Sequence, residues 1–236
     1  MSKHMKRLTA PISWPISRKS NVWVTKPAPG PHAVRKSMPL LVIVRDLAGY
    51  CDTAREARRI IGARKIYVDG KPARDYKLPV GLFDVISIPE TKEHFRVLMD
   101  RRGKFRLMRI SKEEAKWKLV RIENKTVVKG GVTQLNLHDG RNLLLKKDAR
   151  KTGDTLKIAI PEQKVLGAFE LKEGNKAYLI GGSHIGQLGT VQEIEVTRSP
   201  KPNIVIFEDG FSTIKDYVFM VGTDVAQISL PEVDIQ

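Results

Sequence analysis

Apolar and charged residues recur with helical spacing over residues 53–62. At about 100° per residue, four apolar side chains share one side of a helix: Ala54, Ala57, Ile60 and Ile61. Thr53 can cap the amino end of this helix, and Glu56, three residues later, can complete a capping box. The pattern predicts a short helix that packs through one face and presents arginines on the other.

A ribbon pattern follows this helix directly. Gly62 suits a left-handed stop, residues 65–68 alternate like a strand, and Asp69-Gly70 is the strongest short signal for a hairpin turn. Apolar runs predict two further elements, a helix at residues 40–48 and a strand at residues 82–88. These elements together form a compact helix-helix-ribbon module.

The next part of the chain reads mostly as strands. Period-two alternation predicts strands at residues 95–99, 105–110, 118–123, 126–128, 133–137, 142–145 and 155–159. Glycine-containing turns separate them at the spacing of a small barrel or sandwich. The only helix predicted here covers residues 111–117, with Ser111 as its cap.

Glycines mark a bend in the last part of the chain. Strands are predicted at residues 178–180, 188–196, 204–207, 214–220 and 225–230. Gly182 and Gly186 lie between the first two of these strands, and Gly189 lies at the start of the second. They permit positive φ angles and close backbone approach at the bend.

The first 39 residues do not read as a globular segment. Six prolines interrupt every candidate helix. Basic residues alternate with Trp14 and Trp23, whose rings are useful for stacking on bases or for packing on the body. In isolation this segment would be largely disordered, and we expect an extended basic arm that orders on RNA. A tail without a ligand is the alternative.

These patterns predict an α+β, β-rich, multidomain protein. The expected parts are an extended arm over residues 1–39, a module over 40–93, a central β-barrel or sandwich over 94–170, and an SH3-like barrel over 171–236.

Charge is distributed unevenly among these parts. Residues 1–40 carry eight Lys and Arg and no acid, residues 41–120 carry nineteen bases and eleven acids, and residues 121–236 carry fifteen of each. The formal charge of +16 therefore lies entirely in the first half. Such a concentration is typical of a protein that neutralises phosphates.

Other classes of protein fit less well. No lipidation signal, signal peptide or apolar run of about 20 residues is present, so we expect an intracellular protein without a membrane partner. A single cysteine, Cys51, excludes a disulfide framework and a zinc site built on clustered thiolates, and it is expected to be a small buried hydrophobe.

Several strings resemble known families. Residues 53–61 and 65–70 resemble the small RNA-binding domain first named for ribosomal protein S-four, and the glycines of residues 182–189 resemble a KOW motif. Four strings look like the S-four-e family of small-subunit ribosomal proteins, and the match covers essentially the whole chain in the family's order: residues 6–11 with Ser13-Trp14, 29–32, 78–86 and 137–142.

The resemblance implies a role in RNA binding. Together with the charge pattern, it implies RNA contacts for Lys6, Arg7, Arg18, Lys19, His32, Arg35, Lys36, Arg55, Arg58, Arg59, Arg64, Lys65, Lys71 and Arg74. It also implies small-subunit rRNA and neighbouring small-subunit ribosomal proteins as partners. We expect a monomer within a cytoplasmic ribosomal particle and no DNA partner.

Two alternatives belong to other function classes. Pseudouridine synthases often carry the same small domain, and their catalysis centres on an aspartate shortly after a Gly-Arg pair. Here Gly140-Arg141 is followed by Asn142, while Asp139 precedes the pair in an expected turn. The five histidines lack metal-ligand spacing, so no catalytic residue, metal or cofactor is predicted. A transcription elongation accessory is the other alternative, although it would not need the acid-free arm.

Overall fold

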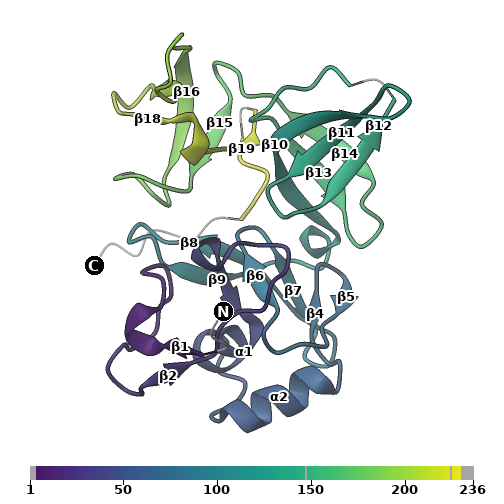
Figure 1. The fold of residues 1–236 in the computed structure, drawn as a ribbon, viewed down its shortest axis with the longest axis vertical. Helices are drawn as coiled ribbons and strands as arrows, with labels where there is room; N and C mark the ends of the chain where they lie inside the picture. Colours follow the sequence, from purple (N-terminus) through teal and green to yellow (C-terminus); the bar gives the residue numbers. More distant parts are fainter. Residues whose placement is uncertain (1–3, 147, 224, 230–236) are drawn as a thin grey trace. The chain divides into compact units, whose positions relative to one another are not determined.

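The computed structural model describes residues 4–146, 148–223 and 225–229. These residues divide into two compact units (Figure 1). The first unit contains residues 4–100 and 104–118, and the second contains residues 101–103 and 119–229. Each unit is described by itself below.

A five-stranded sheet forms the centre of the first unit. Its strands are β4 (Tyr67–Val68), β5 (Lys71–Pro72), β7 (Val85–Ile88), β8 (Glu93–Met99) and β9 (Phe105–Arg109), in the order β5-β4-β7-β8-β9. A second small sheet pairs β3 (Ser37–Pro39) with β6 (Pro79–Gly81). The helices are α1 (Leu40–Val42), which continues as the π-helical turn η3 (Ile43–Leu47), and α2 (Ala54–Gly62). The helix-helix-ribbon prediction agrees with these elements.

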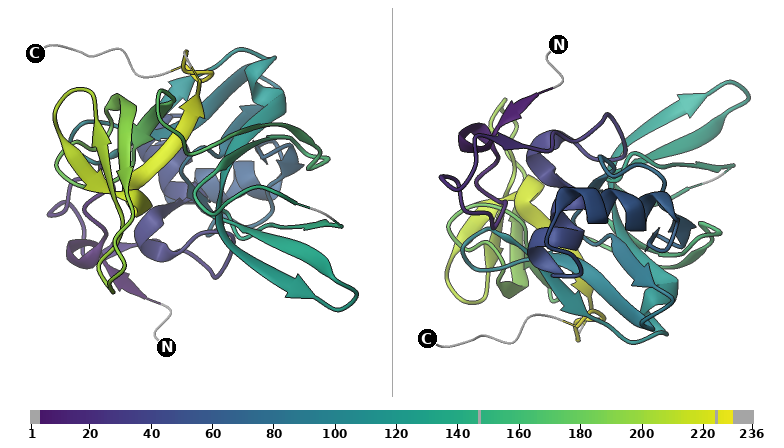
Figure 2. Two further views of the ribbon diagram at one scale, coloured as in Figure 1. Left: turned by 90° about the horizontal axis from the view of Figure 1, so that it is seen from above. Right: turned by 90° about the horizontal axis from the view of Figure 1, so that it is seen from below.

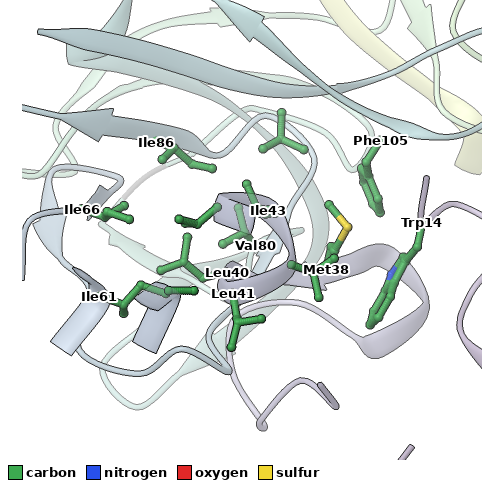
Figure 3. Close-up of a cluster of buried hydrophobic side chains, with 14 of the residues drawn as sticks. Trp14, Met38, Leu40, Leu41, Ile43, Ile61, Ile66, Val80, Ile86 and Phe105 are labelled. Carbon is green, nitrogen blue, oxygen red and sulfur yellow. The ribbon is translucent and has the colours of Figure 1, made fainter. Parts of the chain in front are cut away.

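One apolar core joins the helices to the sheet. Figure 3 shows side chains from α1 and η3, such as Leu40 and Ile43, lying against Ile61 of α2 and Ile86 of β7. Burial of such aliphatic side chains contributes about 1.5–3 kcal/mol each. The apolar face predicted for α2 is therefore the face that packs, since Ala57 and Ile61 are fully buried.

Three details of this unit differ from the sequence predictions. β8 and β9 were expected in the central domain, but residues 93–96 of β8 pair with β7, and β9 pairs with β8. The sheet of the first unit therefore extends beyond residue 93. The strand predicted at residues 82–88 begins only at Val85, as β7, because Phe83 takes a positive φ of 64° in the turn that follows β6. The helix predicted at residues 111–117 shrinks to one turn, η4 (Glu114–Lys116), because Trp117 already begins the next strand.

The amino-terminal segment is folded onto the first unit, which corrects the prediction of an extended arm. β1 (Met5–Lys6) pairs with β2 (Trp23–Val24), and two short 3-10 turns, η1 (Arg7–Thr9) and η2 (Val34–Lys36), lie between the remaining loops. Trp14 is 1% exposed within the core, and its Nε1 donates to the Ser37 carbonyl at 2.7 Å. Burial of this large ring offsets the ordering entropy that favoured disorder.

The second unit contains two five-stranded sheets. The strands of the first are β10 (Trp117–Val128), β11 (Val132–Leu137), β12 (Asn142–Leu145), β13 (Thr155–Ala159) and β14 (Val165–Phe169), in the order β12-β11-β10-β13-β14. The strand β10 begins in the first unit and continues into the second. The inner face of this sheet is apolar and includes Leu135, Leu156 and Ile158.

The other sheet follows the glycine-spaced stretch. Its strands are β15 (Lys176–Leu179), β16 (Leu188–Glu195), β17 (Ile204–Phe207), β18 (Ser212–Ile214) and β19 (Val218–Gly222), in the order β18-β17-β16-β15-β19.

Two strands predicted near the carboxyl end differ from the structure. The strand predicted at residues 214–220 is interrupted by the turn η5 (Lys215–Tyr217). Residues 225–229 of the predicted last strand contain no strand, and residue 230 lies outside the described part. The β-rich class is confirmed, whereas closure into an SH3-like barrel stays a prediction.

Candidate nucleic-acid interface

The helix α2 begins with the predicted capping box. The Glu56 backbone N–H donates to Thr53 Oγ1 at 3.2 Å, and the Glu56 carboxylate accepts from the backbone N–H of Thr53 at 3.4 Å and of Asp52 at 3.2 Å. Hydrogen bonds from Thr53 and then Asp52 lower the pKa of Glu56. The only acid of α2 is thus used at its amino end, where the helix dipole also favours a negative charge.

Apart from Glu56 and Gly62, the exposed residues of α2 are all arginines. Arg55, Arg58 and Arg59 are exposed, and no carboxylate of the described residues forms an ion pair with them. In the view from below, no other element of the first unit covers α2 (Figure 2, right). The Arg58 guanidinium lies 4.7 Å from the ring centroid of Tyr76, which holds it against the body. We call these three arginines the α2 basic face.

More cations follow α2 along the chain. Arg64, Lys71 and Arg74 are exposed, and Lys65 forms an exposed ion pair with Glu90 at 3.0 Å. The left-handed residue after the helix is Arg64, with φ 59°, rather than Gly62, which is the last helical residue. This corrects the predicted helix stop. Surface ion pairs such as Lys65–Glu90 are worth at most about 1 kcal/mol, so Lys65 remains available to a phosphate.

The predicted cations of the amino-terminal segment fall into two groups. Lys6, Lys19, Arg35 and Lys36 are exposed. Arg7 and Arg18 instead bind backbone carbonyls of their own segment. Arg7 is 6% exposed and donates to the Ser17 carbonyl, and Arg18 donates to the carbonyls of Leu8, Ala10 and Pro11 at 2.8–3.1 Å.

His32 is also buried and bound within the protein. Its Nε2 lies 2.9 Å from Asp84 Oδ2, and its ring fills the space beside Gly81, where a Cβ would lie 2.5 Å away. The structure therefore gives His32 a role in packing, contrary to the phosphate contact expected from its proline turn.

Asp84 joins His32 to a buried ionic cluster that sequence reasoning missed. Lys118 Nζ lies 2.5 Å from Asp84 Oδ1 and 2.8 Å from Asp69 Oδ2. All these side chains are less than 10% exposed. Burial by itself raises the pKa of Asp84, but His32 and Lys118 outweigh it and lower that pKa well below its ordinary value. Because Lys118 is buried in this cluster, it is not available to bind RNA, although it belongs to the basic first half of the chain.

A second buried cation, Arg96, was also missed. Its guanidinium lies 4.5 Å from the Trp117 ring and donates to the carbonyls of Glu114 and Trp117 at 3.0 and 3.1 Å. Burial lowers the pKa of Arg96 to about 10, although Glu114 and Asp69 act in the opposite direction. The alternation of β8 gives no signal that this arginine points inward, because Phe95 and Val97 flank it.

The glycines of the second unit take the predicted backbone roles. Gly182 and Gly186 have φ angles of 82° and 78°. Gly189 permits close approach, since a Cβ there would lie 2.5 Å from the Phe207 ring. Any tight β-bend can use such glycines, so the KOW motif stays a prediction.

The residues considered for catalysis lie in structural roles. Asp139 is 1% exposed and accepts from the Arg141 backbone N–H at 3.2 Å, as a turn aspartate does. Among the described residues, no group of three metal-ligand side chains is close enough to hold an ion. Cys51 is half-buried, and burial raises the pKa of its thiol. No helix in the described part of the chain is long and apolar enough to cross a membrane.

Comparison with known families gives three matches along the chain. Residues 1–35 match the RS4NT (NUC023) domain, residues 38–86 match the S4 domain, and residues 91–165 match the ribosomal family S4e. The S4 match covers α1, α2 and the ribbon that carry the α2 basic face and the cations after it.

Individual relatives match nearly the full length. The chain is 48% identical over 233 residues to the small ribosomal subunit protein eS4 of Methanothermobacter thermautotrophicus, covering 97% of this chain and 96% of the relative. It is 46% identical over 240 residues to the protein of the same name from Methanocaldococcus jannaschii, covering 97% of each chain. A solved structure, the 30S ribosomal protein S4e from Thermoplasma acidophilum, is 40% identical with a TM-score of 0.72, covering 80% of this chain and 96% of that one.

Proposed function

Because the chain belongs to the ribosomal family S4e, it is a structural constituent of the small ribosomal subunit, and we propose that it binds small-subunit rRNA through exposed cations of its first unit. The residues assigned to this surface are Lys6, Lys19, Arg35, Lys36, Arg55, Arg58, Arg59, Arg64, Lys65, Lys71 and Arg74. Arg7, Arg18 and His32 support that surface from within.

The α2 basic face carries this proposal. Three guanidinium groups without carboxylate partners among the described residues lie on a rigid, capped helix. Each arginine can donate two parallel hydrogen bonds to one phosphate, and binding releases condensed counterions. Phosphate contacts position a protein without reading sequence, so selectivity would come from the shape of the folded rRNA.

The enzymatic alternative is not favoured. The matching relatives are ribosomal structural proteins, and Asp139 and Arg141 bind each other in a turn. We expect no uridine isomerisation by this protein. The elongation-accessory alternative is not favoured either, because the family matches extend over the amino-terminal segment and the S4 domain. Neighbouring ribosomal proteins in a cytoplasmic particle are the other expected partners, with one copy of the chain in each particle.

Salt dependence of rRNA binding tests the α2 basic face. The variant R55A/R59A removes two phosphate contacts and leaves Arg58 on Tyr76, so the slope of log affinity against log salt should fall by about 1.4 to 1.8. The matched variant K172A/K201A removes two exposed cations from the second unit and should keep the wild-type slope. An unchanged slope for R55A/R59A would exclude the α2 basic face from the interface.

A further inference from the structure

One face of the sheet in the second unit carries a row of asparagines. In the register of β10, β11 and β12, Asn124 is opposite Asn136, and Asn136 is opposite Asn142. The next row contains Thr126, Gln134 and Leu144. Figure 1 shows the three strands side by side. We call these two rows the amide face.

The amide face points away from the core of its sheet. Leu135 is fully buried, and its partners across the sheet are Lys125 and Leu143. Because neighbouring residues of a strand alternate between faces, Asn136 and its row lie on the opposite face. Asn124, Thr126 and Asn142 are exposed, and Leu144 is 62% exposed. The exposed side chains of the amide face are therefore available to a ligand.

The composition of this face is unusual for a strand surface. Asparagine is depleted in strands, so three of them in one cross-strand row lower strand propensity. Solvation alone does not require them, since charged residues make up 29% of this chain and serve its other surfaces. Within the face, Gln134 Nε2 donates to Asn136 Oδ1 at 2.7 Å, while Asn142 makes no side-chain hydrogen bond with a described residue. Several amide donors and acceptors remain open.

The charges around the face fit a polyanion. Neither row contains a carboxylate, and the exposed Lys129 and Lys146 lie at the turn after β10 and directly after β12. Residues 124–146 contain four basic residues and one acid, Asp139, which is buried and paired with Arg141. Glu123, directly before Asn124, is exposed but forms an ion pair with Arg121 at 2.6 Å, so the rim keeps a net positive charge that attracts phosphates.

We propose that the amide face binds the minor groove of an rRNA double helix. That groove is wide and shallow, and it displays 2′-hydroxyls and base edges that both donate and accept hydrogen bonds, as amides do. Neither row contains an aromatic residue, whereas binding of single strands relies on aromatic stacking. The ligand class rests on the proposed function, but the surface is separate from the α2 basic face.

Asparagine-to-aspartate changes test this proposal without removing an internal bond. In N124D/N142D, residue 124 can still accept from the Lys125 backbone N–H at 2.7 Å, and the two new charges have Asn136 between them. The control Q192E/N203D adds the same charge at β16 and directly before β17, and residue 203 can still accept the bond from the Thr197 N–H. Thermal unfolding of each variant checks that it folds like the wild type.

The readout is binding of the full chain to a small-subunit rRNA transcript with hydroxyl-radical footprinting. We expect N124D/N142D to bind about tenfold more weakly and to lose ribose protection along the minor groove of one short duplex, while the control keeps both. Affinity within twofold of the wild type, an equal loss in the control, or protection lost only at unpaired nucleotides would overturn the inference. Loss of binding to a neighbouring ribosomal protein with rRNA binding intact would also overturn it.

The variant R55A/R59A separates this inference from the proposed function. If R55A/R59A weakens binding and N124D/N142D does not, the proposed function stands and the amide face is excluded. If neither variant affects the rRNA complex, the proposed function fails as well.

Discussion

The amino-terminal segment and α2 are both rich in arginine, yet the structure uses these arginines differently. In the amino-terminal segment, Arg7 and Arg18 donate to backbone carbonyls of loops that form few regular elements. In α2 the backbone is satisfied by the helix and its capping box, so Arg55 and Arg59 have no internal role. A high local charge therefore does not by itself identify an RNA contact. An arginine is available to RNA only where no backbone carbonyl or carboxylate of the protein already accepts its hydrogen bonds.

The largest effect is expected at a cation that is wholly internal. Lys118 is the only lysine bound to both Asp69 and Asp84 among the described residues, and K118M would leave two carboxylates buried without it. Breaking such a buried pair costs about 3–5 kcal/mol of unfolding free energy. Denaturant unfolding measures this loss, with K116M as the control because Lys116 is exposed. A cost below about 1 kcal/mol for K118M would contradict an essential ionic cluster.

The next effect concerns docking of the amino-terminal segment. Trp14 is 1% exposed and Trp23 is 58% exposed, so W14A should cost about 3 kcal/mol and W23A at most about 0.5 kcal/mol. In limited proteolysis of the free protein, residues 4–36 should resist cleavage in the wild type and W23A, and be cleaved in W14A. Rapid cleavage of this segment in the free wild type would instead restore the extended arm.

Acid should weaken the same unit. The pKa of Asp84 is lowered in the folded state, so its contribution to stability is complete above the unfolded value of about 3.9 and is lost as the pH falls below it. His32 and Lys118 contact Asp84 in this cluster, and Asp69 shares Lys118 with it. Unfolding measured at pH 7, 5, 4 and 3 should show nearly constant stability from pH 7 to 5 and a decline below pH 4. A decline already complete at pH 5 would contradict this assignment.

Local signals predicted much of the first unit. The capping box of Thr53 and Glu56 and the Asp69-Gly70 turn depend on residues close in sequence, and both are present, with φ angles of 49° and 74° at the turn. β12, β13 and β17 also have the predicted bounds, because glycine turns and apolar alternation define them.

Contacts between residues far apart in the sequence could not be predicted from those local signals. Lys118 meets Asp69 across 49 residues and Asp84 across 34, and nothing in the local pattern distinguishes it from exposed lysines. Trp14 donates to the carbonyl of Ser37, which lies 23 residues away in the sequence. Local sequence could therefore not show whether the Trp14 ring packs in the core or stacks on a base. The prediction that α2 stops at a left-handed Gly62 was also wrong. The left-handed residue is Arg64, although this conformation is more typical of glycine.

Arginine-specific dicarbonyl modification of the native protein, read by mass spectrometry in the free chain and in the assembled small subunit, tests the central claim most directly. Arg55 and Arg59 should react in the free protein and be protected in the subunit, while Arg96, which is fully buried, should react slowly in both. Equal reactivity of Arg55 and Arg59 in the two states would contradict the claim that α2 presents its free guanidinium groups to rRNA.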